Sequence, residues 1–471
     1  MGGEWSNHRL ADVIELIGGG TPKRSRSDYW GGDIPWLSVK DFNDDYRHVY
    51  SAEETITEDG LNNSSTKILE AGEIIISARG TVGALAQLAR PMAFNQSCYG
   101  INAKSEFTFN DYLFYLLRYT VANLQRITHG AVFDTITRET FQHVDITLPS
   151  IPEQRAIAHI LGTLDDKIEL NRQMNKTLEA MAQALFKSWF IDFDPVVVNA
   201  LRAGNPVPDQ FAQRACLRRS FGRQAAHYRD NPRALSLPED TLRQFPDRFQ
   251  DSELGPIPEG WGVQSLDDIA TFLNGLACQK YPAAPGELSL PVIKIRELRQ
   301  GISGNTDRAT TNVPEKYIVH NGDVLFSWSG SLLIDIWTQG KGVLNQHVFK
   351  VSSENYPKWF YFHWLDFHLL EFQRIAADKA TTMGHIKRHH LADAKVIVPD
   401  SDIMKLASAH VSPIFDNKIE NAIQARSLAT LRDILLPKLI SGELRLSAAA
   451  LETLAAQAGV PDVEKLLEEA I

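Results

Sequence analysis

The sequence predicts an α+β protein in which two pseudo-symmetric α/β domains are joined by two long coiled-coil-like helices. Three observations lead to this fold class. The chain repeats a pattern of residue types after about 250 positions, each copy mixes β-favouring runs with helical segments, and each copy precedes a long segment with apolar residues three or four apart. The length of 471 residues suits this plan, because domains average roughly 150 residues.

The repeat consists of similar segments that keep their order. Trp5 corresponds to Trp261, 256 positions later, and 34–41 corresponds to 290–297 at the same offset. The second copy is then about six residues shorter, so the later pairs are 71–77 with 321–327, 95–96 with 345–346, 136–138 with 386–388, and 144–149 with 394–399. Because the order holds over about 145 residues, we interpret the copies as duplicated domains.

Each copy contains the elements of a mixed domain. The runs 74–77 and 324–327 follow Gly-acid turns and favour strands. The aromatic segments 111–117 and 359–365 favour buried helices, with a strand as the alternative. Their aromatic side chains suit core packing better than stacking on bases.

A long helix is expected after each copy. From Pro152 about 39 residues run without proline, which gives a helix of roughly 58 Å. Asn171 and Asn175 lie on its seam, where polar residues can fix helix register, while Pro437 would kink or end the second helix and Gly442 would cap it. The seam and partner-docking residues are Leu161, Leu164, Ile168, Leu178, Leu185 and Trp189 in the first helix, and Phe415, Ile419 and Leu435 in the second.

Domain boundaries follow from these patterns. The segments are a first domain (1–150), a central helix (151–192), a connector (193–258), a second domain (259–400), a C-terminal helix (401–442) and a helical tail (443–471). Between 202 and 249 the connector holds nine arginines and five acidic residues, including Arg214, Arg218, Arg219, Arg223 and Arg229. This composition fits either contact with phosphates or an acidic partner, or a solvated helix in a linker.

The overall charge and the cysteines exclude some classes of protein. A formal net charge of −10 argues against coating nucleic acid by bulk charge, although a local basic face stays compatible with it. The three cysteines are far apart and form no CxxC pair, so we expect neither a disulfide framework nor a thiolate zinc site. With no leader-like N-terminus and no apolar run of 18 residues, we expect a soluble, cytoplasmic protein without contact to a membrane.

Catalytic motifs are missing. The chain has no GxxxxGK[ST] loop, no GxGxxG after a strand, no HExxH and no GxSxG. The segments 194–196 and 231–233 lack the residues of an amino-methyltransferase loop. The sequence therefore predicts a chain that catalyses no reaction and binds no cofactor.

Two weaker patterns leave alternatives open. Asp400, Asp416 and Lys418 imitate the acid-spacer-acid-x-Lys arrangement of Mg²⁺-dependent nucleases, but the first copy lacks the first acid. His385 and His389, with His390 adjacent, have the spacing of two metal ligands on a helix, yet no third ligand is evident. A nuclease and a coiled-coil scaffold without DNA specificity are thus the alternative functions.

The positive signal is a set of polar and basic residues at repeated loop positions. Hydroxyl and glycine-rich turns suit phosphate contacts, Arg can bind guanine, and Asn or Gln can bind adenine through two hydrogen bonds, although turn capping is the alternative for the Asn-Gln pairs. The candidate DNA-binding residues are Lys23, Arg24, Lys40, Ser77, Arg79, Thr81, Asn95, Gln96, Thr137 and Arg138 in the first copy, and Lys280, Lys294, Arg296, Ser327, Ser329, Ser331, Asn345, Gln346, Lys387 and Arg388 in the second.

The chain resembles the specificity subunit of type I DNA restriction–modification enzymes over nearly its whole length. The stretches that carry the resemblance are LFKSWFIDFDP (185–195), DSELGPIPEGW (251–261) and LLPKLISGEL (435–444). Two features depart from it, because the connector is Arg-rich and the tail after Leu446 is not placed by the resemblance.

The resemblance implies two target-recognition domains held apart by two antiparallel helices that act as a ruler. Each domain would read one half of a split target in double-stranded DNA, and helix length would set the gap between the halves. The subunit itself would be non-catalytic. It would recruit two modification subunits, which bind S-adenosylmethionine and methylate adenine, and two restriction subunits, which use ATP and Mg²⁺ to translocate and cleave DNA.

Overall fold

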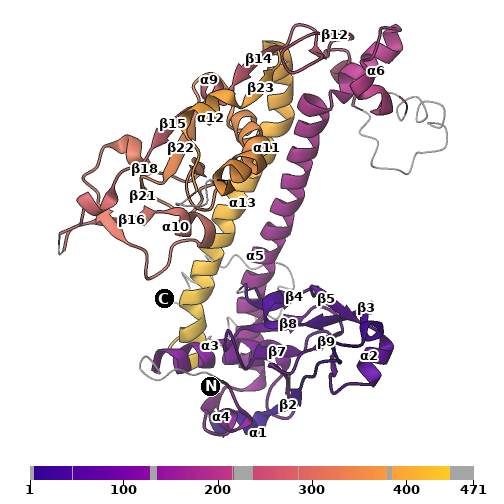
Figure 1. Ribbon diagram of the computed structural model, residues 1–471. Coiled ribbons are helices and arrows are strands. Elements are labelled where there is room, and N and C mark those ends of the chain that lie inside the picture. The colour runs from indigo at the N-terminus through magenta and orange to yellow at the C-terminus, as the bar shows by residue number, and fades with distance from the viewer. Residues whose placement is uncertain are drawn as a thin grey trace. The chain divides into compact units, whose positions relative to one another are not determined.

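The computed structural model describes residues 5–44, 46–127, 135–214, 216, 237–284, 286–378 and 384–445. The chain divides into two compact units (Figure 1). Unit 1 contains Met1–Leu170 together with Ala425–Ile471, and unit 2 contains Asn171–Gln424. Unit 1 is therefore built from two separate stretches of sequence, whereas unit 2 is one continuous stretch.

Unit 1 contains three sheets. The five-stranded sheet has the order β2 (Ile14–Gly18), β10 (Cys98–Ala103), β7 (Ile74–Ser77), β8 (Leu85–Leu88) and β4 (His48–Val49). The four-stranded sheet has the order β5 (Glu54–Ile56), β3 (Trp30–Leu37), β9 (Met92–Phe94) and β6 (Ile68–Leu69), and a two-stranded sheet pairs β1 (Ser6–Arg9) with β11 (Asp145–Leu148). Its short helices are α1 (Leu10–Val13), η1 (Ser27–Tyr29), η2 (Val39–Phe42), α2 (Glu58–Asn62) and α4 (Arg138–Gln142), and α3 spans Asn110–Ile127.

Unit 2 repeats this topology. One four-stranded sheet has the order β15 (Thr271–Asn274), β22 (Val348–Ser352), β19 (Val324–Ser327) and β20 (Ile334–Ile336). A second has the order β17 (Arg308–Thr310), β16 (Ser289–Ile293), β21 (Gly342–Leu344) and β18 (Ile318–Val319), and a two-stranded sheet pairs β14 (Gly262–Ser265) with β23 (Lys395–Val398). Its helices include α9 (Leu266–Ile269), η5 (Cys278–Lys280), α10 (Ile295–Gln300), η6 (Glu315–Tyr317), α11 (Lys358–Ala377) and α12 (Arg388–Asp393). The first of these sheets has four strands and matches the five-stranded sheet of unit 1 without β4, and the other two match strand for strand. These strand orders confirm the duplication and the mixed α+β fold.

The predicted strands and aromatic helices are confirmed. Strands β7 and β19 cover the two β-favouring runs, and all four residues of each are buried. In α3 the six residues from Tyr112 to Leu117 are buried, and in α11 the seven residues from Trp359 to Leu365 are buried. Helix is preferred to strand here because each segment is long enough for several turns and packs against both a sheet and a long helix.

Two long helices cross the boundary between the units. Helix α5 covers Ile151–Phe186 and continues as the π-helical turn η3 (Lys187–Ile191), and α13 covers Ser401–Ser441. Within each unit they run antiparallel, since Asp165 contacts Arg432 in unit 1 and Asn171 contacts Gln424 in unit 2. Helix α13 does not end at Pro437. It continues to Ser441, where Gly442 takes the left-handed conformation with φ of +76° and caps it as predicted.

The described part of the connector belongs to the core of unit 2. It contains α6 (Asp194–Ala203), η4 (Asp209–Phe211), α8 (Glu239–Leu242) and the paired strands β12 (Phe249–Gln250) and β13 (Ile257–Pro258). Phe193, Val197 and Phe245 are buried in the same cluster as Trp189 and Trp261. Arg214 binds Asp194 at 2.9 Å, whereas Arg218, Arg219, Arg223 and Arg229 lie outside the described residues, as does the tail from 446. None of the described helices is long and apolar enough to cross a membrane.

Candidate nucleic-acid interface

In unit 1 three of the predicted loop segments meet at one edge of the five-stranded sheet. Residue Arg79, in the loop after β7, forms an isolated β-bridge with Thr135, just ahead of α4. The Ile136 N–H donates to the Ala78 carbonyl at 2.9 Å, and the Ala78 N–H donates to the Ser97 carbonyl at 2.8 Å. We call the segments 77–83, 95–97 and 135–138 loop edge 1.

In unit 2 the same three segments meet, each 250 positions later. Ser329 forms the β-bridge with His385, and the Ile386 N–H donates to the Trp328 carbonyl at 3.0 Å. The Trp328 N–H lies 3.4 Å from the His347 carbonyl. We call 327–331, 345–347 and 384–388 loop edge 2. Sequence positions far apart are thus brought together identically in both copies.

Two more segments join each edge. At Gly19 a Cβ atom would lie 2.1 Å from the Asn95 carbonyl oxygen, and at Gly275 it would lie 2.3 Å from that of Asn345, so only glycine fits this close approach. The Asn95 N–H also donates to the Leu37 carbonyl at the end of β3. The residues that follow β2 and β3 therefore flank loop edge 1, and those after β15 and β16 flank loop edge 2.

The repeated serines hold the loops in shape. The Ser77 hydroxyl donates to the Thr81 carbonyl and accepts from the Ala84 N–H at 2.9 Å. In the second copy the Ser327 hydroxyl donates to the Ser331 carbonyl at 2.7 Å and accepts from the Leu333 N–H at 2.9 Å. Both serines are fully buried. Direct DNA contact by either is excluded in this conformation, whereas Thr81 and Ser331 are exposed.

The two asparagines act mainly as turn caps, which was the alternative to adenine binding. The Asn95 Oδ1 accepts from the Ser97 N–H at 3.0 Å, and the Asn345 Oδ1 accepts from the His347 N–H at 3.3 Å. Asn345 is also buried. The neighbouring Gln96 is exposed and bonds to Thr21, and Gln346 is half-buried with its Nε2 3.3 Å from His347 Nε2, so the glutamines are the better placed members of each pair.

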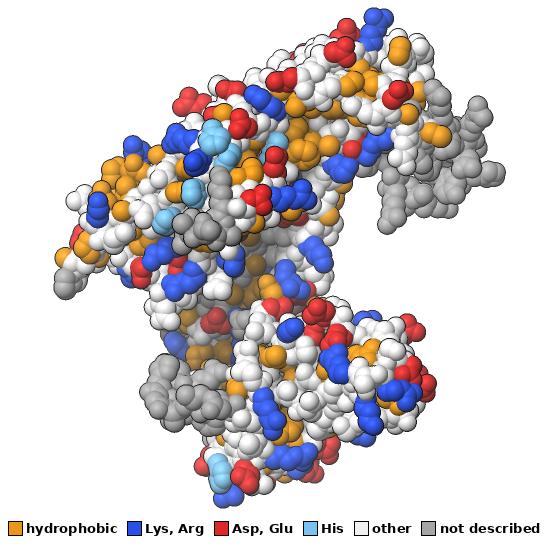
Figure 2. Space-filling view, in the orientation of Figure 1, with side chains coloured by type: hydrophobic (Ala, Val, Ile, Leu, Met, Phe, Trp, Pro, Cys, Tyr) orange, Lys and Arg blue, Asp and Glu red, His pale blue; other side chains and the backbone are white. Residues whose placement is uncertain are grey.

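Exposed Lys and Arg side chains lie at both loop edges. Arg79 is exposed in loop edge 1, together with Arg138 at the start of α4, where the Thr137 side chain caps the helix. Lys387, which precedes α12, and Arg388, its first residue, occupy the equivalent positions and are exposed. Figure 2 shows Lys, Arg and His side chains gathered over the region of α12 and neighbouring strands in unit 2.

The remaining predicted cations lie in the flanking segments, and several are paired with carboxylates. Arg24 binds Glu54 and holds the pKa of that carboxyl below its usual range, and its guanidinium lies 3.8 Å from the Trp30 ring. Lys294 binds Asp307 in the same way. Arg296 binds the buried Glu297 at 2.7 Å and the Asn305 carbonyl at 2.8 Å. The exposed lysines of these segments are Lys23, Lys40 and Lys280.

Loop edge 2 also presents an aromatic group that our candidate list omitted. The Trp328 ring is half-buried, with its centroid 5.8 Å from that of His347 and 6.3 Å from that of His385. Ser329 is buried and its hydroxyl lies 3.1 Å from His347 Nδ1. The signal was visible in the sequence as a tryptophan inside a Ser-Gly-rich turn, but the two histidines approach it only through the fold.

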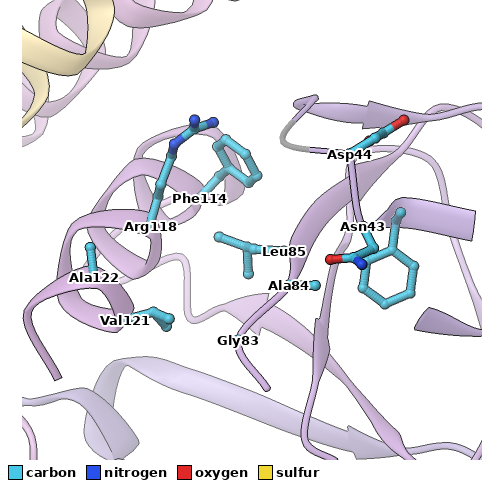
Figure 3. Close-up of a pocket in the computed structure, with 10 residues that line it drawn as sticks. Asn43, Asp44, Gly83, Ala84, Leu85, Phe114, Arg118, Val121 and Ala122 are labelled. Carbon is cyan, nitrogen blue, oxygen red and sulfur yellow. The ribbon is translucent and has the colours of Figure 1, made fainter. Parts of the chain in front are cut away.

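A pocket lies beside loop edge 1 (Figure 3). Its lining residues come from η2 and the following turn, from the start of β8 and from α3, and they are Phe42, Asn43, Asp44, Gly83, Ala84, Leu85, Phe114, Arg118, Val121 and Ala122. The Arg118 guanidinium is 3.9 Å from Asp433 of α13. Arg118 therefore already has a carboxylate neighbour within unit 1.

The nuclease alternative is not supported by the geometry. Asp400 Oδ1 caps α13 by accepting from the N–H groups of Asp402 and Ile403. Asp416 lies 16 positions later on the same helix, which separates the two acids by about 24 Å. Lys418 forms an ion pair with Glu179. Among the described residues, no three His, Cys, Asp or Glu side chains are placed to hold a metal ion, and the His390 ring accepts from the Lys387 N–H.

The predicted seam residues face the interior of their own units. Leu161, Leu164, Ile168, Trp189, Phe415 and Leu435 are buried, and Leu178, Leu185 and Ile419 are half-buried. The buried six pack within the chain, and partner docking by the half-buried three stays a prediction. The large apolar side chains that the long helices expose are Leu170 and Ile434 in unit 1, and Met174 and Met181 in unit 2.

Comparison with known proteins agrees with this architecture. The model of the type I restriction modification DNA specificity domain matches residues 2–180 and 258–426. The chain is 27% identical over 452 residues to the type I restriction enzyme MjaIX specificity subunit of Methanocaldococcus jannaschii, covering 94% of each chain. It is 25% identical over 333 residues to the HindI specificity subunit of Haemophilus influenzae, covering 67% of this chain and 72% of that one.

A solved structure shares the fold. The crystal structure of a type I restriction-modification S subunit from M. genitalium superimposes with a TM-score of 0.53 at 13% identity, covering 93% of this chain and 96% of that one. The family match falls on both copies of the duplication and on parts of both long helices. This chain, with its two repeated domains and its paired long helices, belongs to the type I restriction-modification DNA specificity family.

Proposed function

We propose that the protein is the DNA-reading subunit of a type I restriction–modification complex and that loop edges 1 and 2 each contact one half of a bipartite target. The observation that carries this proposal is the convergence of the same three loops in both units, with different side chains at equivalent positions. Ala78, Ser97 and Thr135 in loop edge 1 correspond to Trp328, His347 and His385 in loop edge 2. A shared scaffold with different contact groups suits two readers of different sequences.

The exposed side chains divide into two expected roles. Arg79, Gln96, Arg388 and Gln346 have the chemistry to bind base edges or nearby phosphates, and Lys23, Lys40 and Lys280 would position the duplex through its backbone. Arg24, Lys294 and Arg296 already bind carboxylates, so a phosphate would have to compete for them. The overall negative charge fits a subunit whose partners supply part of the clamp around DNA.

The partners and their cofactors are also part of the proposal. Two modification subunits carrying S-adenosylmethionine and two restriction subunits using ATP and Mg²⁺ would complete the complex, and this chain would hold none of these cofactors itself. Docking would use the exposed apolar side chains of the long helices, Met174 and Met181 in unit 2 and Leu170 and Ile434 in unit 1. Association buries such exposed apolar groups.

The first test is a genome-wide map of N6-methyladenine in cells that express this chain with its cognate modification subunit. We expect one bipartite motif, with two short specified halves around a fixed gap. A single continuous half-site would mean that one unit does not read DNA. Absence of any motif that depends on this chain, while the modification subunit is active, would contradict the proposal and favour a scaffold.

A pair of variants assigns each loop edge to its half. Arg79→Ala should relax or weaken recognition of one half, and Arg388→Ala the other, each costing about 1–3 kcal/mol if the side chain binds a base. Arg90→Ala and Lys341→Ala are matched controls, because both side chains are exposed in turns at the opposite ends of the strands from the loop edges. Equal effects of all four variants on both halves would point to general electrostatics instead.

A further inference from the structure

A buried hydrogen-bonded network joins three helices in unit 1. The Tyr115 hydroxyl of α3 donates to Asp165 Oδ2 of α5 at 2.7 Å, and Arg432 Nη1 of α13 donates to Asp165 Oδ1 at 2.7 Å. The side chains of Asp165 and Arg432 are only 3% and 4% exposed. Each carboxylate oxygen thus has one buried donor, and each donor comes from a different helix.

The network is surrounded by apolar side chains. Leu161 and Leu164 of α5 are buried beside it, and Leu435 and Leu439 of α13 belong to the same cluster. One helical turn before and after Arg432, α13 carries Leu428 and Leu436. A shift of α13 by one turn along α5 would therefore place a leucine against Asp165. The carboxylate would lose its guanidinium partner, while Arg432 would keep its pairing with the adjacent Asp433 on the same helix.

Unit 2 differs in the polar contacts that join the long helices. They include the Asn171 amide with Gln424 Oε1 at 2.9 Å and the Asn175 amide with the Lys418 carbonyl at 2.9 Å. The ion pair of Lys418 with Glu179 is more exposed, at 19% and 37% of the side chains. Neutral amides and a partly hydrated pair find new partners after a shift more easily than a buried carboxylate and guanidinium do.

We propose that Tyr115, Asp165 and Arg432 form a register lock, which selects one register of α5 against α13 and so fixes the number of unspecified base pairs between the two half-sites. The inference rests on the proposed function, because register affects recognition only if the chain reads two half-sites. Buried polar groups in helix pairs act best as devices for register, since their net contribution to stability is small. A one-turn shift is 5.4 Å, which corresponds to about 1.6 base pairs of DNA.

The decisive variant moves the arginine by one turn without changing composition. In Leu428→Arg/Arg432→Leu the guanidinium reaches Asp165 only if α13 shifts by one turn along α5. Expressed with the modification subunit, this variant should methylate a motif with unchanged half-sites and a gap altered by one or two base pairs. A purely structural role for the network would lower complex yield and leave the gap unchanged.

A second variant removes the lock. Tyr115→Phe/Asp165→Leu/Arg432→Leu replaces the network by apolar groups, and we expect methylated sites with more than one gap length. The matched control, Glu179→Gln/Lys418→Gln, removes the ion pair of unit 2 and should keep the single gap. Assembled variants that all retain the wild-type gap would overturn the proposal, as would failure of both lock variants to assemble when the control assembles. If the unaltered chain gives no bipartite motif, the proposed function itself fails.

Discussion

At equivalent positions in both units, a serine that the sequence suggested for DNA contact is buried. Its hydroxyl stabilises a loop of the fold instead of binding a ligand. The pattern of strand, serine, glycine and threonine predicted a loop directly after a strand, and the structure has such a loop at the edge that we propose for DNA contact. It did not reveal that Ser77 and Ser327 point inward, because side-chain direction depends on the register of β7 and β19 within their sheets. Exposure separates the binding candidates Thr81 and Ser331 from these structural residues.

Removing either buried hydroxyl should therefore affect stability. Ser77→Ala leaves the partly buried Ala84 N–H without its acceptor, and Ser327→Ala does the same for Leu333, each at a cost of about 1–3 kcal/mol. The free energy of unfolding, obtained from thermal or chemical unfolding of the protein and its variants, provides the measurement. Ser331→Ala, an exposed serine in the same loop, is the control and should change stability by less than about 0.5 kcal/mol.

His363 gives the molecule a predictable dependence on pH. It is buried among Phe186, Phe362 and Phe415, and burial together with the nearby Lys418 lowers its pKa to about 3. Below the ordinary pKa of 6.5 the unfolded chain takes up a proton that the folded chain refuses. This stabilisation is complete above pH 6.5 and is progressively lost as the pH falls toward 3.

The test compares the protein with His363→Phe, which keeps an aromatic ring in the cluster. Between pH 6.5 and 5.5 the unaltered chain should lose about 1 kcal/mol more unfolding free energy than the variant, since one pH unit corresponds to 1.36 kcal/mol per proton. Unfolding at both pH values provides the measurement. Identical pH profiles would show that His363 is not held neutral in the core.

At the scale of elements, the long helices were predictable and their contacts were not. Apolar spacing located α5 and α13, and Asn171 was correctly placed on the seam, where it meets Gln424. Of the two expected effects of Pro437, a kink or an end of the helix, the end was wrong, because the apolar contacts of Leu435, Leu436, Leu439 and Ile440 hold the last turns in place. Contacts between residues more than 240 positions apart produce no periodic pattern in the sequence of either helix alone.

A deletion in the long helices tests their role as a ruler. Removing residues 171–177 shortens α5 by about 10.5 Å, or roughly three base pairs of DNA. Because α13 runs antiparallel to it, the single deletion should alter the gap or abolish activity. A second deletion of 418–424, which removes the partners of Asn171 and Asn175, should restore assembly with a shortened gap. An unchanged gap in the methylated motif would refute the ruler.

For the whole molecule, the duplication was the strongest signal in the sequence. It predicted two domains of one fold, and the strand orders, which match except for the additional strand β4 in unit 1, confirm this. The division of each domain into three sheets was not predictable, since strands such as β4, β6 and β18 have only two residues. The loop edges likewise form through hydrogen bonds between segments that are distant in sequence, so recurrence located their parts without showing that they meet.

Exchanging the contact groups of one unit for those of the other tests their independence. The variant Trp328→Ala/His347→Ser/His385→Thr gives loop edge 2 the residues that loop edge 1 carries at equivalent positions. We expect degenerate or altered recognition of one half of the motif, while the other half and the gap stay the same. A methylation map provides the readout, and a change in both halves would contradict separate reading by the two units.

The division of unit 1 between the two ends of the chain has a consequence for synthesis on the ribosome. Unit 2 is continuous and can fold once its last residue, Gln424, has emerged, whereas the core of unit 1 lacks Leu435, Leu436, Leu439 and Ile440 until these later residues have been translated. The domain made first is thus completed last. A premature stop codon near residue 425 would consequently damage the N-terminal domain and leave the later one intact.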